Sequence, residues 1–257
     1  MANRFAAVVF LIAAAWPLTG QAQSPSCDPR LDQVRLANPL SRVADKLRRG
    51  DPVVIVAIGS SSTAGAGASS SAASYPSRLQ AELRAHFKGH SIAVLNRGVG
   101  GEEVGDMLKR FDKAVVAARP DLVLWQLGTN SVIRDHPLAS HDAAIRVGLD
   151  KIRATGADVV LIDPQFAPKV IVKPYAAQMV ALIAHTAKQE NVDLFPRYDV
   201  MRRWYEVDHL AFATFVAPDG LHMNDWSYAC FAKSLGLAIS EAATRPVLSA
   251  AVRAFAD

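Results

Sequence analysis

Residues 52–65 read PVVIVAIGSSSTAG and give the strongest indication of the fold class. The apolar part, residues 52–58, is unbroken and rich in β-branched side chains, which is typical of a strand covered on both faces. Similar runs recur at 92–95, 122–127 and 159–162, with a weaker one at 192–195. Strands of this kind belong in a parallel sheet, where crossover helices cover both faces.

Four segments with helical spacing separate these runs: 77–87, 104–118, 143–154 and 175–189. In the second of them, Leu108, Phe111 and Val115 recur at three- and four-residue intervals and are expected on one face of a single helix. The alternation of strands and helices predicts an α/β fold in which helices sandwich a parallel sheet of about five strands.

Length and composition exclude several classes of protein. The 257 residues suit one α/β domain, and 51% hydrophobic with 20% charged residues excludes a disordered chain. The net charge of +4 is spread along the chain without a Lys/Arg block, so no nucleic-acid partner is expected. Two cysteines cannot form a disulfide scaffold or a four-cysteine zinc site.

The N-terminus has the layout of a secretory signal peptide. Arg4 supplies a short positive region, residues 6–16 are almost entirely apolar, and Gly20 and Ala22 place small residues at the cleavage-determining positions. The apolar run is too short to span a bilayer, although a retained N-terminal anchor is the alternative. We therefore predict a signal peptide over 1–22, cleaved near Ala22, and a periplasmic or secreted protein without stable membrane insertion.

Export makes the two cysteines informative. The mature chain would comprise an N-terminal extension (23–50) and one folded domain (51–257). Cys27 lies in the extension and Cys230 lies near the C-terminus. In an oxidising compartment they could form a disulfide that ties the extension to the last helices. The alternative is two unpaired thiols, with Cys230 buried in a helix.

Small and polar residues follow three successive strands, at 59–65, 96–101 and 128–131. Ligands bind beyond the carboxyl ends of the strands in such sheets, so a site is expected at these exits. The first exit is not a phosphate loop, because Ala64 stands where a Walker sequence needs its second glycine and no lysine follows. The stretch after Gly65 lacks the third glycine of a dinucleotide fingerprint.

Ser61, at the first exit, can act as a nucleophile if a histidine removes its proton and a carboxylate orients that histidine. His222 lies in the sequence PDGLHMN at 218–224, three residues after Asp219 and directly before the last helix, whose expected N-cap is Asn224. One short loop could therefore present both the imidazole and its carboxylate. The other histidines lie in segments typical of surface or core histidines.

Ester hydrolysis also needs hydrogen-bond donors for the oxyanion. The backbone N–H groups of Ser61 and Gly101 and the side-chain amide of Asn130 would stand together at strand exits. Each such donor can lower the barrier by roughly 3–4 kcal/mol. Taken singly, Gly101 would also suit a helix-capping turn and Asn130 an Asx turn.

In this combination the residues resemble the blocks that name the SGNH (GDSL-type) hydrolases. Ser61 matches the block I nucleophile, Gly101 the block II glycine, Asn130 the block III asparagine, and Asp219 with His222 matches block V. The blocks occur in family order and span most of the mature chain. The resemblance implies a flavodoxin-like three-layer α/β/α fold, a Ser-His-Asp triad, and ester hydrolysis that needs no metal or other cofactor.

The sequence departs from the family pattern at Ser60 and Ser131, where the family usually has Asp. Neither position belongs to the triad or the oxyanion hole, but the changes leave the shape of the pocket and the substrate preference open. Thr63 stands where Gly-x-Ser-x-Gly needs its second glycine, so the chain is not an α/β-hydrolase of the nucleophile-elbow type.

Fewer residues point to the substrate. Candidate contacts are Arg97, Ser131, Phe166 and Trp204, the last in an aromatic-rich stretch that could also line an acyl pocket or belong to the core. No long apolar insertion suggests a lipase lid, so we expect short acyl esters, O-acetyl groups on a glycan or small molecule in particular. The alternatives are a lipid-directed esterase, lysophospholipase or thioesterase, an acetyltransferase, and a non-hydrolytic glycan-binding protein.

Overall fold

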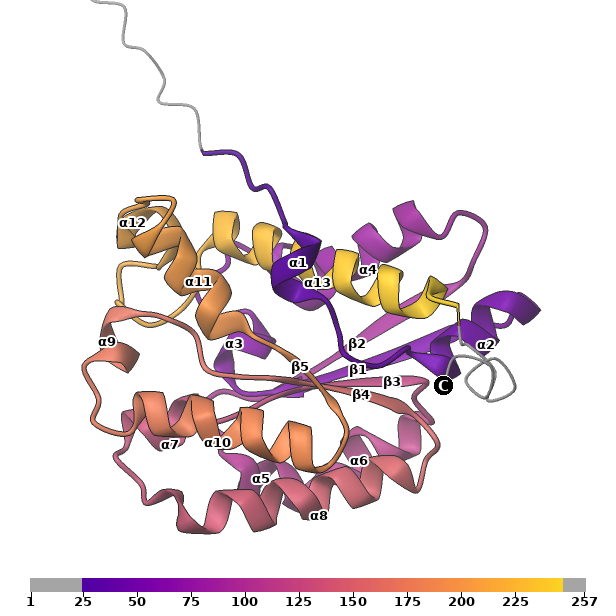
Figure 1. Ribbon diagram of the computed structural model, residues 1–257, viewed down its shortest axis with the longest axis horizontal. Helices are drawn as coiled ribbons and strands as arrows, with labels where there is room; N and C mark the ends of the chain where they lie inside the picture. Colours follow the sequence, from indigo (N-terminus) through magenta and orange to yellow (C-terminus); the bar gives the residue numbers. More distant parts are fainter. Residues whose placement is uncertain (1–24, 247–257) are drawn as a thin grey trace, which may run out of the picture.

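Five parallel strands form the central sheet in the spatial order β2-β1-β3-β4-β5. They are β1 (Val53–Gly59), β2 (Ile92–Gly98), β3 (Leu122–Gln126), β4 (Asp158–Ile162) and β5 (Asp193–Phe195), each on one of the predicted apolar runs. The computed structural model describes residues 25–246. After β2 the chain crosses to the other side of β1, so the predicted parallel, flavodoxin-like α/β/α sandwich is confirmed (Figure 1).

Helices cover both faces of this sheet (Figure 1). On one face α4 (Tyr75–His86) packs against α13 (Asp225–Thr244), with α1 (Leu31–Val34) beside α13. The opposite face carries α5 (Val104–Lys109), α8 (His141–Arg153) and α10 (Ala176–Gln189). The shorter elements are α2 (Ser41–Arg49), α3 (Ser61–Ala64), α6 (Phe111–Ala114), α7 (Thr129–Ile133), α9 (Pro168–Ile171), α11 (Arg197–Glu206), α12 (Phe212–Phe215) and the 3-10 turns Ser71–Ala73, Val116–Ala118 and Leu138–Ser140.

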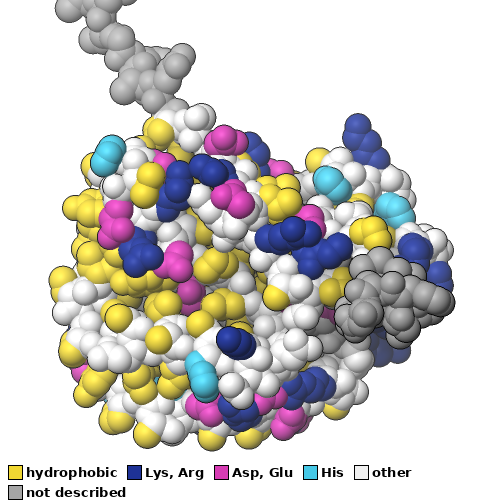
Figure 2. Space-filling model, viewed as in Figure 1, with side chains coloured by type: hydrophobic (Ala, Val, Ile, Leu, Met, Phe, Trp, Pro, Cys, Tyr) yellow, Lys and Arg dark blue, Asp and Glu magenta, His cyan; other side chains and the backbone are white. Residues whose placement is uncertain are grey.

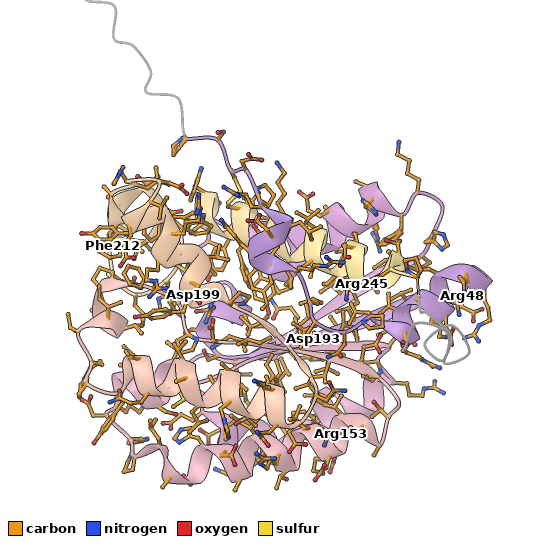
Figure 3. The ribbon with its side chains drawn as sticks, viewed as in Figure 1. Arg48, Arg153, Asp193, Asp199, Phe212 and Arg245 are labelled. Carbon is orange, nitrogen blue, oxygen red and sulfur yellow. A yellow bond between two sulfur atoms is a disulfide. The ribbon has the colours of Figure 1, made fainter. Side chains whose placement is uncertain are left out.

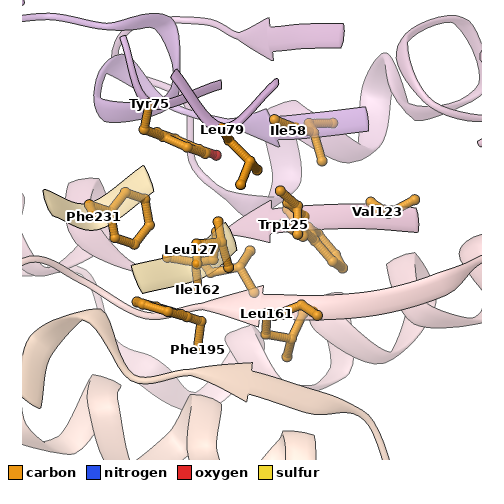
Figure 4. Packing of buried hydrophobic residues seen from close by; sticks show 14 of the residues in the cluster. Ile58, Tyr75, Leu79, Val123, Trp125, Leu127, Leu161, Ile162, Phe195 and Phe231 are labelled. Carbon is orange, nitrogen blue, oxygen red and sulfur yellow. The ribbon is translucent and has the colours of Figure 1, made fainter. Parts of the chain in front are cut away.

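Trp125 of β3 shows how the sheet and the helices interlock. Its side chain is fully buried and lies against Gly148 of α8, where a Cβ would be 2.0 Å from the indole ring. The same ring packs edge-on against Phe111, with centroids 5.3 Å apart. Figure 4 shows Trp125 among the aromatic and branched side chains that fill the core. Burial of this apolar surface, at roughly 25 cal/mol per Å², holds the strand ends in fixed relative positions.

The expectation of a single helix over residues 104–118 is wrong. The segment forms α5, α6 and a 3-10 turn, with breaks at Arg110 and Val115. Arg110 leaves helical geometry (φ −110°, ψ 6°), because its guanidinium turns back to bind the Glu102 carboxylate and the carbonyl oxygen of Arg97. A charge-assisted bidentate contact of this kind outweighs the modest preference of an apolar pattern for one continuous helix.

The described part of the N-terminal extension packs onto the domain. Leu36 and Leu40 are buried in the core, and the carbonyl oxygen of Leu36 accepts a hydrogen bond from Arg245 at 2.8 Å. At the start of α2, the backbone N–H of Val43 donates to the carboxylate of Asp158 at 3.0 Å. Figure 3 labels Arg245 and, at the start of β5, Asp193.

A disulfide joins Cys27 to Cys230 of α13, with the two Cα atoms 5.5 Å apart. Beside it, the indole N–H of Trp226 donates to the carbonyl oxygen of Pro25 at 2.7 Å. The structure therefore contains the pairing that the sequence allowed, and it fastens the extension to the last helix.

Residues 1–24, and with them the predicted signal peptide and its cleavage point, lie outside the described residues. Within residues 25–246, no helix combines the length and the apolar character needed to cross a bilayer. On the face shown in Figure 2, basic and acidic side chains are interspersed.

Candidate active site

Ser61 is the first residue of α3 and lies two positions beyond Gly59, the last residue of β1, with Ser60 between them. At the start of a helix its N–H has no acceptor inside that helix, and it donates to no other residue of the described chain. Gly98 of β2 lies directly against the turn, since a Cβ there would be 2.1 Å from the backbone nitrogen of Ala64. The nucleophile candidate therefore stands half-buried at the carboxyl edge of the sheet, with an available N–H.

His222 and Asp219 lie in one tight loop that turns at Gly220 (φ 70°). Asp219 Oδ1 accepts the backbone N–H groups of both Leu221 and His222 at 2.9 Å, which fixes the carboxylate within the loop. Asn224 caps α13, as predicted. The helix thus begins at Asp225, three residues after His222, and anchors the end of this loop.

Ser61, His222 and Asp219 form one continuous hydrogen-bonded chain. Ser61 Oγ lies 2.8 Å from His222 Nε2, and His222 Nδ1 lies 2.5 Å from Asp219 Oδ2. Partial burial raises the pKa of Asp219, but hydrogen bonds from the His222 ring and from two backbone N–H groups lower the pKa more, to about 2. Asp219 is therefore ionised near neutral pH, and a carboxylate at Nδ1 turns Nε2 toward the serine as a proton acceptor.

The loop after β2 lies directly beside the nucleophile. The N–H of Val99 donates to the carbonyl oxygen of Gly59 at 3.0 Å. A Cβ on Gly100 would lie only 3.9 Å from the Cβ of Ser61. The block II segment therefore lies against Ser61.

Two further donors belong to this segment and its neighbour. Gly101 has φ 80°, and its N–H bonds no acceptor among residues 25–246. The amide of Asn130 donates to the carbonyl oxygen of Glu102 at 2.9 Å, which holds the Gly101 loop in place. An amide nitrogen carries two N–H groups, so Asn130 has a second one for a ligand.

Ser60 occupies the family's usual Asp position and faces Gln126 at the end of β3. Gln126 Oε1 accepts two hydrogen bonds from Ser60, from its N–H at 2.9 Å and from its hydroxyl at 3.0 Å. It accepts a third from the hydroxyl of Thr63 at 3.3 Å. Both Ser60 and Gln126 are 1% exposed, so this buried network holds the turn between β1 and Ser61 in place. Sequence reasoning missed Gln126, although a polar residue inside the apolar run 122–127 was an available signal.

Glu103 supports block III in a similar way. Its carboxylate accepts the Ser131 hydroxyl at 2.7 Å and the Arg134 guanidinium at 2.5 Å, and lies 3.0 Å from Nδ1 of His136. Burial raises the pKa of Glu103, but these hydrogen bonds lower the pKa more. Ser131 is 1% exposed. The expectation that Ser131 contacts the substrate is therefore wrong, because its hydroxyl is buried and bonded to Glu103.

The other expected substrate contacts lie in different environments. Arg97 is exposed on the edge strand β2, and its side chain bonds no residue in the described part of the chain. Trp204 is 7% exposed and packs edge-on against Phe215 and Trp226, so it is a core residue and its expected substrate contact is corrected. Phe166 is 6% exposed but belongs to a stack that reaches the surface.

That stack contains three rings near the histidine loop. Phe166 and Phe212 are stacked with centroids 5.8 Å apart, and Phe212 and Tyr205 with centroids 4.4 Å apart. Gln165, next to Phe166, donates to the carbonyl oxygen of Leu221 at 3.3 Å. Tyr205 is 43% exposed, and apolar side chains gather on the left of Figure 2, the side on which Figure 3 labels Phe212. Sequence reasoning noted this aromatic stretch but did not single out Tyr205.

Two curated relatives match parts of the chain. An arylesterase from Vibrio mimicus is 28% identical over 123 residues, which are 48% of this chain and 60% of the relative. An acetylxylan esterase from Geobacillus stearothermophilus is 34% identical over 79 residues, which are 31% of this chain and 36% of the relative. The chain therefore spans less than two thirds of the length of either curated relative.

Solved structures of esterases have the same fold. A two-domain esterase active on acetylated mannans, co-crystallised with mannopentaose, has a TM-score of 0.69 at 19% identity, over 87% of this chain and 60% of that one. A catalytic mutant of an acetylxylan esterase from Geobacillus stearothermophilus has a TM-score of 0.64 at 19% identity, over 76% of this chain and 97% of that one. At these identities the likeness shows the fold.

The family follows from a match over nearly all of the described chain. The model of the non-GDSL lipase-like family matches residues 26–245, which include Ser61, Gly101, Asn130 and the loop of Asp219 and His222. That description agrees with block I, where Ser60 replaces the aspartate of the GDSL sequence. The chain thus belongs to the non-GDSL lipase-like family, in agreement with the SGNH-type resemblance of its sequence.

Proposed function

We propose that the protein is a serine esterase that removes short acyl groups, acetyl in particular, from carbohydrate. Ser61 is the nucleophile, His222 the general base and Asp219 the carboxylate that orients the base. The observation that carries the proposal is the 2.8 Å contact between Ser61 Oγ and His222 Nε2, made by residues far apart in the sequence. A serine hydroxyl needs such a base to attack an ester near neutral pH.

Acylation begins when Ser61 Oγ attacks the ester carbonyl carbon while His222 Nε2 accepts the hydroxyl proton. The negative charge on the carbonyl oxygen is stabilised by the N–H groups of Ser61 and Gly101 and by the amide of Asn130. The tetrahedral intermediate then collapses, and the leaving alcohol takes the proton from His222 Nε2. The acyl group remains on Ser61 as an ester.

Deacylation uses the same groups in reverse. His222 Nε2 takes a proton from water as the water oxygen attacks the acyl carbon, and the same donors receive the oxyanion. The carboxylic acid leaves and the proton returns to Ser61 Oγ. Asp219, with its pKa of about 2, stays negative throughout and stabilises the imidazolium formed in both steps.

A carbohydrate ester is supported by the relatives and by the surface beside the triad. The acetylxylan esterase is similar to part of this chain in sequence, and the esterase active on acetylated mannans has the same fold. The exposed face of Tyr205, stacked on Phe212, offers a flat apolar platform close to the histidine loop, against which the C–H face of a sugar ring can pack.

Export is part of the proposal, on the signal-peptide layout of residues 1–22. Expression of the full chain in a bacterial host should yield a periplasmic or secreted protein whose N-terminus lies near Gln23, measured by mass spectrometry of each cell fraction. An intact Met1 on a protein confined to the cytoplasm would contradict export without bearing on the esterase activity.

The esterase activity is tested with p-nitrophenyl acetate, butyrate and octanoate and with acetylated xylan, using wild type, Ser61→Ala and Ser62→Ala. Ser62 is the neighbouring buried serine, and its hydroxyl bonds no described residue, so Ser62→Ala is a matched control. We expect Ser61→Ala to lower kcat by at least about 10³-fold and Ser62→Ala to stay within a few-fold of wild type. Acetate should be preferred over octanoate.

Each other outcome contradicts a part of the proposal. Octanoate preference would point to a lipid ester, and acyl transfer to a sugar exceeding hydrolysis would point to an acetyltransferase. A wild type as inert as Ser61→Ala on all four substrates would overturn the hydrolase assignment in favour of glycan binding.

A further inference from the structure

A cavity of about 660 Å³ lies next to the oxyanion loop, between the start of α5 and the start of α8. Its walls come from segments 103–109 and 136–144, both at the edge of the sheet where the strands end. Glu103 in the wall follows Gly101 by two residues, a separation of at most about 7 Å of extended chain. The cavity therefore lies beside the Gly101 loop, and none of its lining residues belongs to the aromatic stack.

His141 lines this cavity and lacks a hydrogen-bond partner. Its side chain is 7% exposed, and Nδ1 is wholly buried without a partner. No hydrogen bond joins either of its ring nitrogens to a residue within 25–246. A buried polar atom left unpaired costs about 1–3 kcal/mol. Nε2 also has no partner among these residues but is not wholly buried, so it is the ring nitrogen that a hydroxyl group in the cavity can bond, as donor or as acceptor, whereas Nδ1 is out of reach of a ligand.

The remaining walls mix polar groups with small apolar surfaces. His136 and Ser140 are exposed at the cavity and add an imidazole and a hydroxyl, while Val104, Pro137 and Ala144 add apolar surface. Polar edges around an apolar floor match a sugar ring, which has hydroxyl groups around its edge and C–H bonds on its faces.

Other ligand classes fit this cavity less well. An anion would meet the carboxylates of Glu103 and Asp106. A cation would find both carboxylates already paired, Glu103 with Arg134 and Asp106 with Lys109. A long acyl chain would desolvate His136 and Ser140 and leave His141 unpaired, at the same cost as above. A neutral polyol satisfies the polar groups without introducing a like charge.

We propose that this cavity is a sugar-binding subsite that holds a hydroxyl-bearing unit of the carbohydrate chain next to the acetylated unit, with His141 as a hydrogen-bonding residue. The inference rests on the proposed esterase function and adds a position for the polymer. It assigns to His136 and His141 a role in substrate binding, beyond the surface or core placement that the sequence suggested.

The test uses two variants of the cavity and one matched control. His141→Ala removes the unpaired imidazole, and Ala144→Leu fills space from the same face of α8, three residues further on. His185→Ala removes an exposed histidine of α10 that does not line the cavity. Binding of unacetylated xylopentaose and mannopentaose is measured by calorimetry, and kcat and KM are measured for acetylated xylo-oligosaccharide and for p-nitrophenyl acetate.

We expect both cavity variants to weaken oligosaccharide binding at least tenfold and to raise KM for the acetylated oligosaccharide by a similar factor. The kcat/KM for p-nitrophenyl acetate should stay within twofold, because this small ester does not extend into the cavity. His185→Ala should match wild type in every assay. If His141→Ala unfolds, Ala144→Leu decides the question, because it retains the histidine.

The two proposals fail in different ways. Unchanged oligosaccharide affinity in a folded cavity variant would overturn the subsite, even with full esterase activity. Affinity that depends on His141 in a protein that hydrolyses no ester would overturn the esterase function and leave the sugar site in place. Equal loss of p-nitrophenyl acetate and oligosaccharide turnover in a folded variant would assign the residue to catalysis and contradict the subsite.

Discussion

Gly67 lies in direct contact with the loop that carries His222. Its backbone has φ 85°, and a Cβ there would lie 2.3 Å from the carbonyl oxygen of Met223 and 3.0 Å from the Cβ of His222. The segment that follows Ser61 therefore touches the loop that carries His222. Tyr228 of α13 secures this arrangement by donating its hydroxyl to the carbonyl oxygen of Ala66 at 2.7 Å. The separation of Ser61 from His222 depends on this contact.

Gly67→Ala should therefore disturb the catalytic geometry. The added methyl group must push Met223 and His222 away, so we expect kcat for p-nitrophenyl acetate to fall at least tenfold. Gly89→Ala is the control, since Gly89 has φ 87° but nothing within 4 Å of its Cβ position. It should lose about 1–2 kcal/mol of stability from backbone strain and keep its kcat. Equal kcat losses in the two variants would refute the contact argument.

Gln126 should contribute to both stability and turnover. Gln126→Leu leaves the N–H and hydroxyl of Ser60 without their acceptor, so we expect the free energy of unfolding to fall by about 1–3 kcal/mol, and kcat to fall with it. Gln80→Leu removes a comparable acceptor, for the N–H of Val94 at 2.9 Å, away from the nucleophile turn. Urea unfolding and steady-state kinetics on both variants test this. A Gln80→Leu loss of kcat as large as that of Gln126→Leu would contradict the local role.

The disulfide should stabilise the fold without taking part in catalysis. It links Cys27 to Cys230 across 203 residues, a long loop whose closure lowers the entropy of the unfolded chain. We expect the double variant Cys27→Ser/Cys230→Ser to lose about 2–5 kcal/mol in urea unfolding and to keep kcat at 25 °C. Reductant should lower the Tm of wild type and leave the double variant unaffected, whereas an equal response of both proteins would show that the bond does not stabilise the fold.

Because of Asp158, the free energy of unfolding should fall as the pH rises from about 4 to about 6. Burial raises the pKa of Asp158 to about 6, although the N–H groups of Val43 and Arg42 act in the opposite direction. Between its ordinary pKa of 3.8 and about 6, the folded state holds a proton that the unfolded state releases. The stability contributed by this carboxyl is thus fully present below about pH 4 and decreases up to about pH 6.

Relative to Asp158→Asn, wild type should therefore lose up to about 3 kcal/mol between pH 4 and pH 7. Urea unfolding at several pH values measures the difference. Asp150→Asn, at an exposed position of α8, should show no such dependence. A wild type that gains stability over Asp158→Asn as pH rises would show that the carboxyl is stabilised in its charged form.

Asp219 should act as a carboxylate over the whole working range of pH. Its pKa of about 2 means that it does not titrate between pH 4 and pH 9. Asp219→Asn should thus lower kcat by several orders of magnitude, by nearly the same factor at every pH in that range. The ratio of wild-type to variant kcat/KM across the range measures this, and a ratio that falls toward one at pH 5 would assign Asp219 a higher pKa.

The α/β class and the strand positions could be predicted from the residues alone, and Ser61, Asp219 and His222 could be singled out as candidates. An unbroken β-branched run such as 52–58 is stable only when both faces are covered, and small polar residues at a strand exit leave few roles besides a turn or a site. Both signals are local, so they can be read from neighbouring residues. Asp219 and His222 are only three residues apart, so their pairing could likewise be inferred from neighbouring residues.

How these segments meet depends on tertiary packing, which local patterns do not encode. Ser60 and Gln126 are 66 residues apart and Ser61 and His222 are 161 apart, so their hydrogen bonds exist only because the sheet brings the strand ends together. The break at Arg110 and the burial of Ser131 and Trp204 likewise depend on partners that local periodicity does not encode. Side-chain burial and pairing are properties of packed surfaces, and those surfaces form only after the helices and strands have assembled.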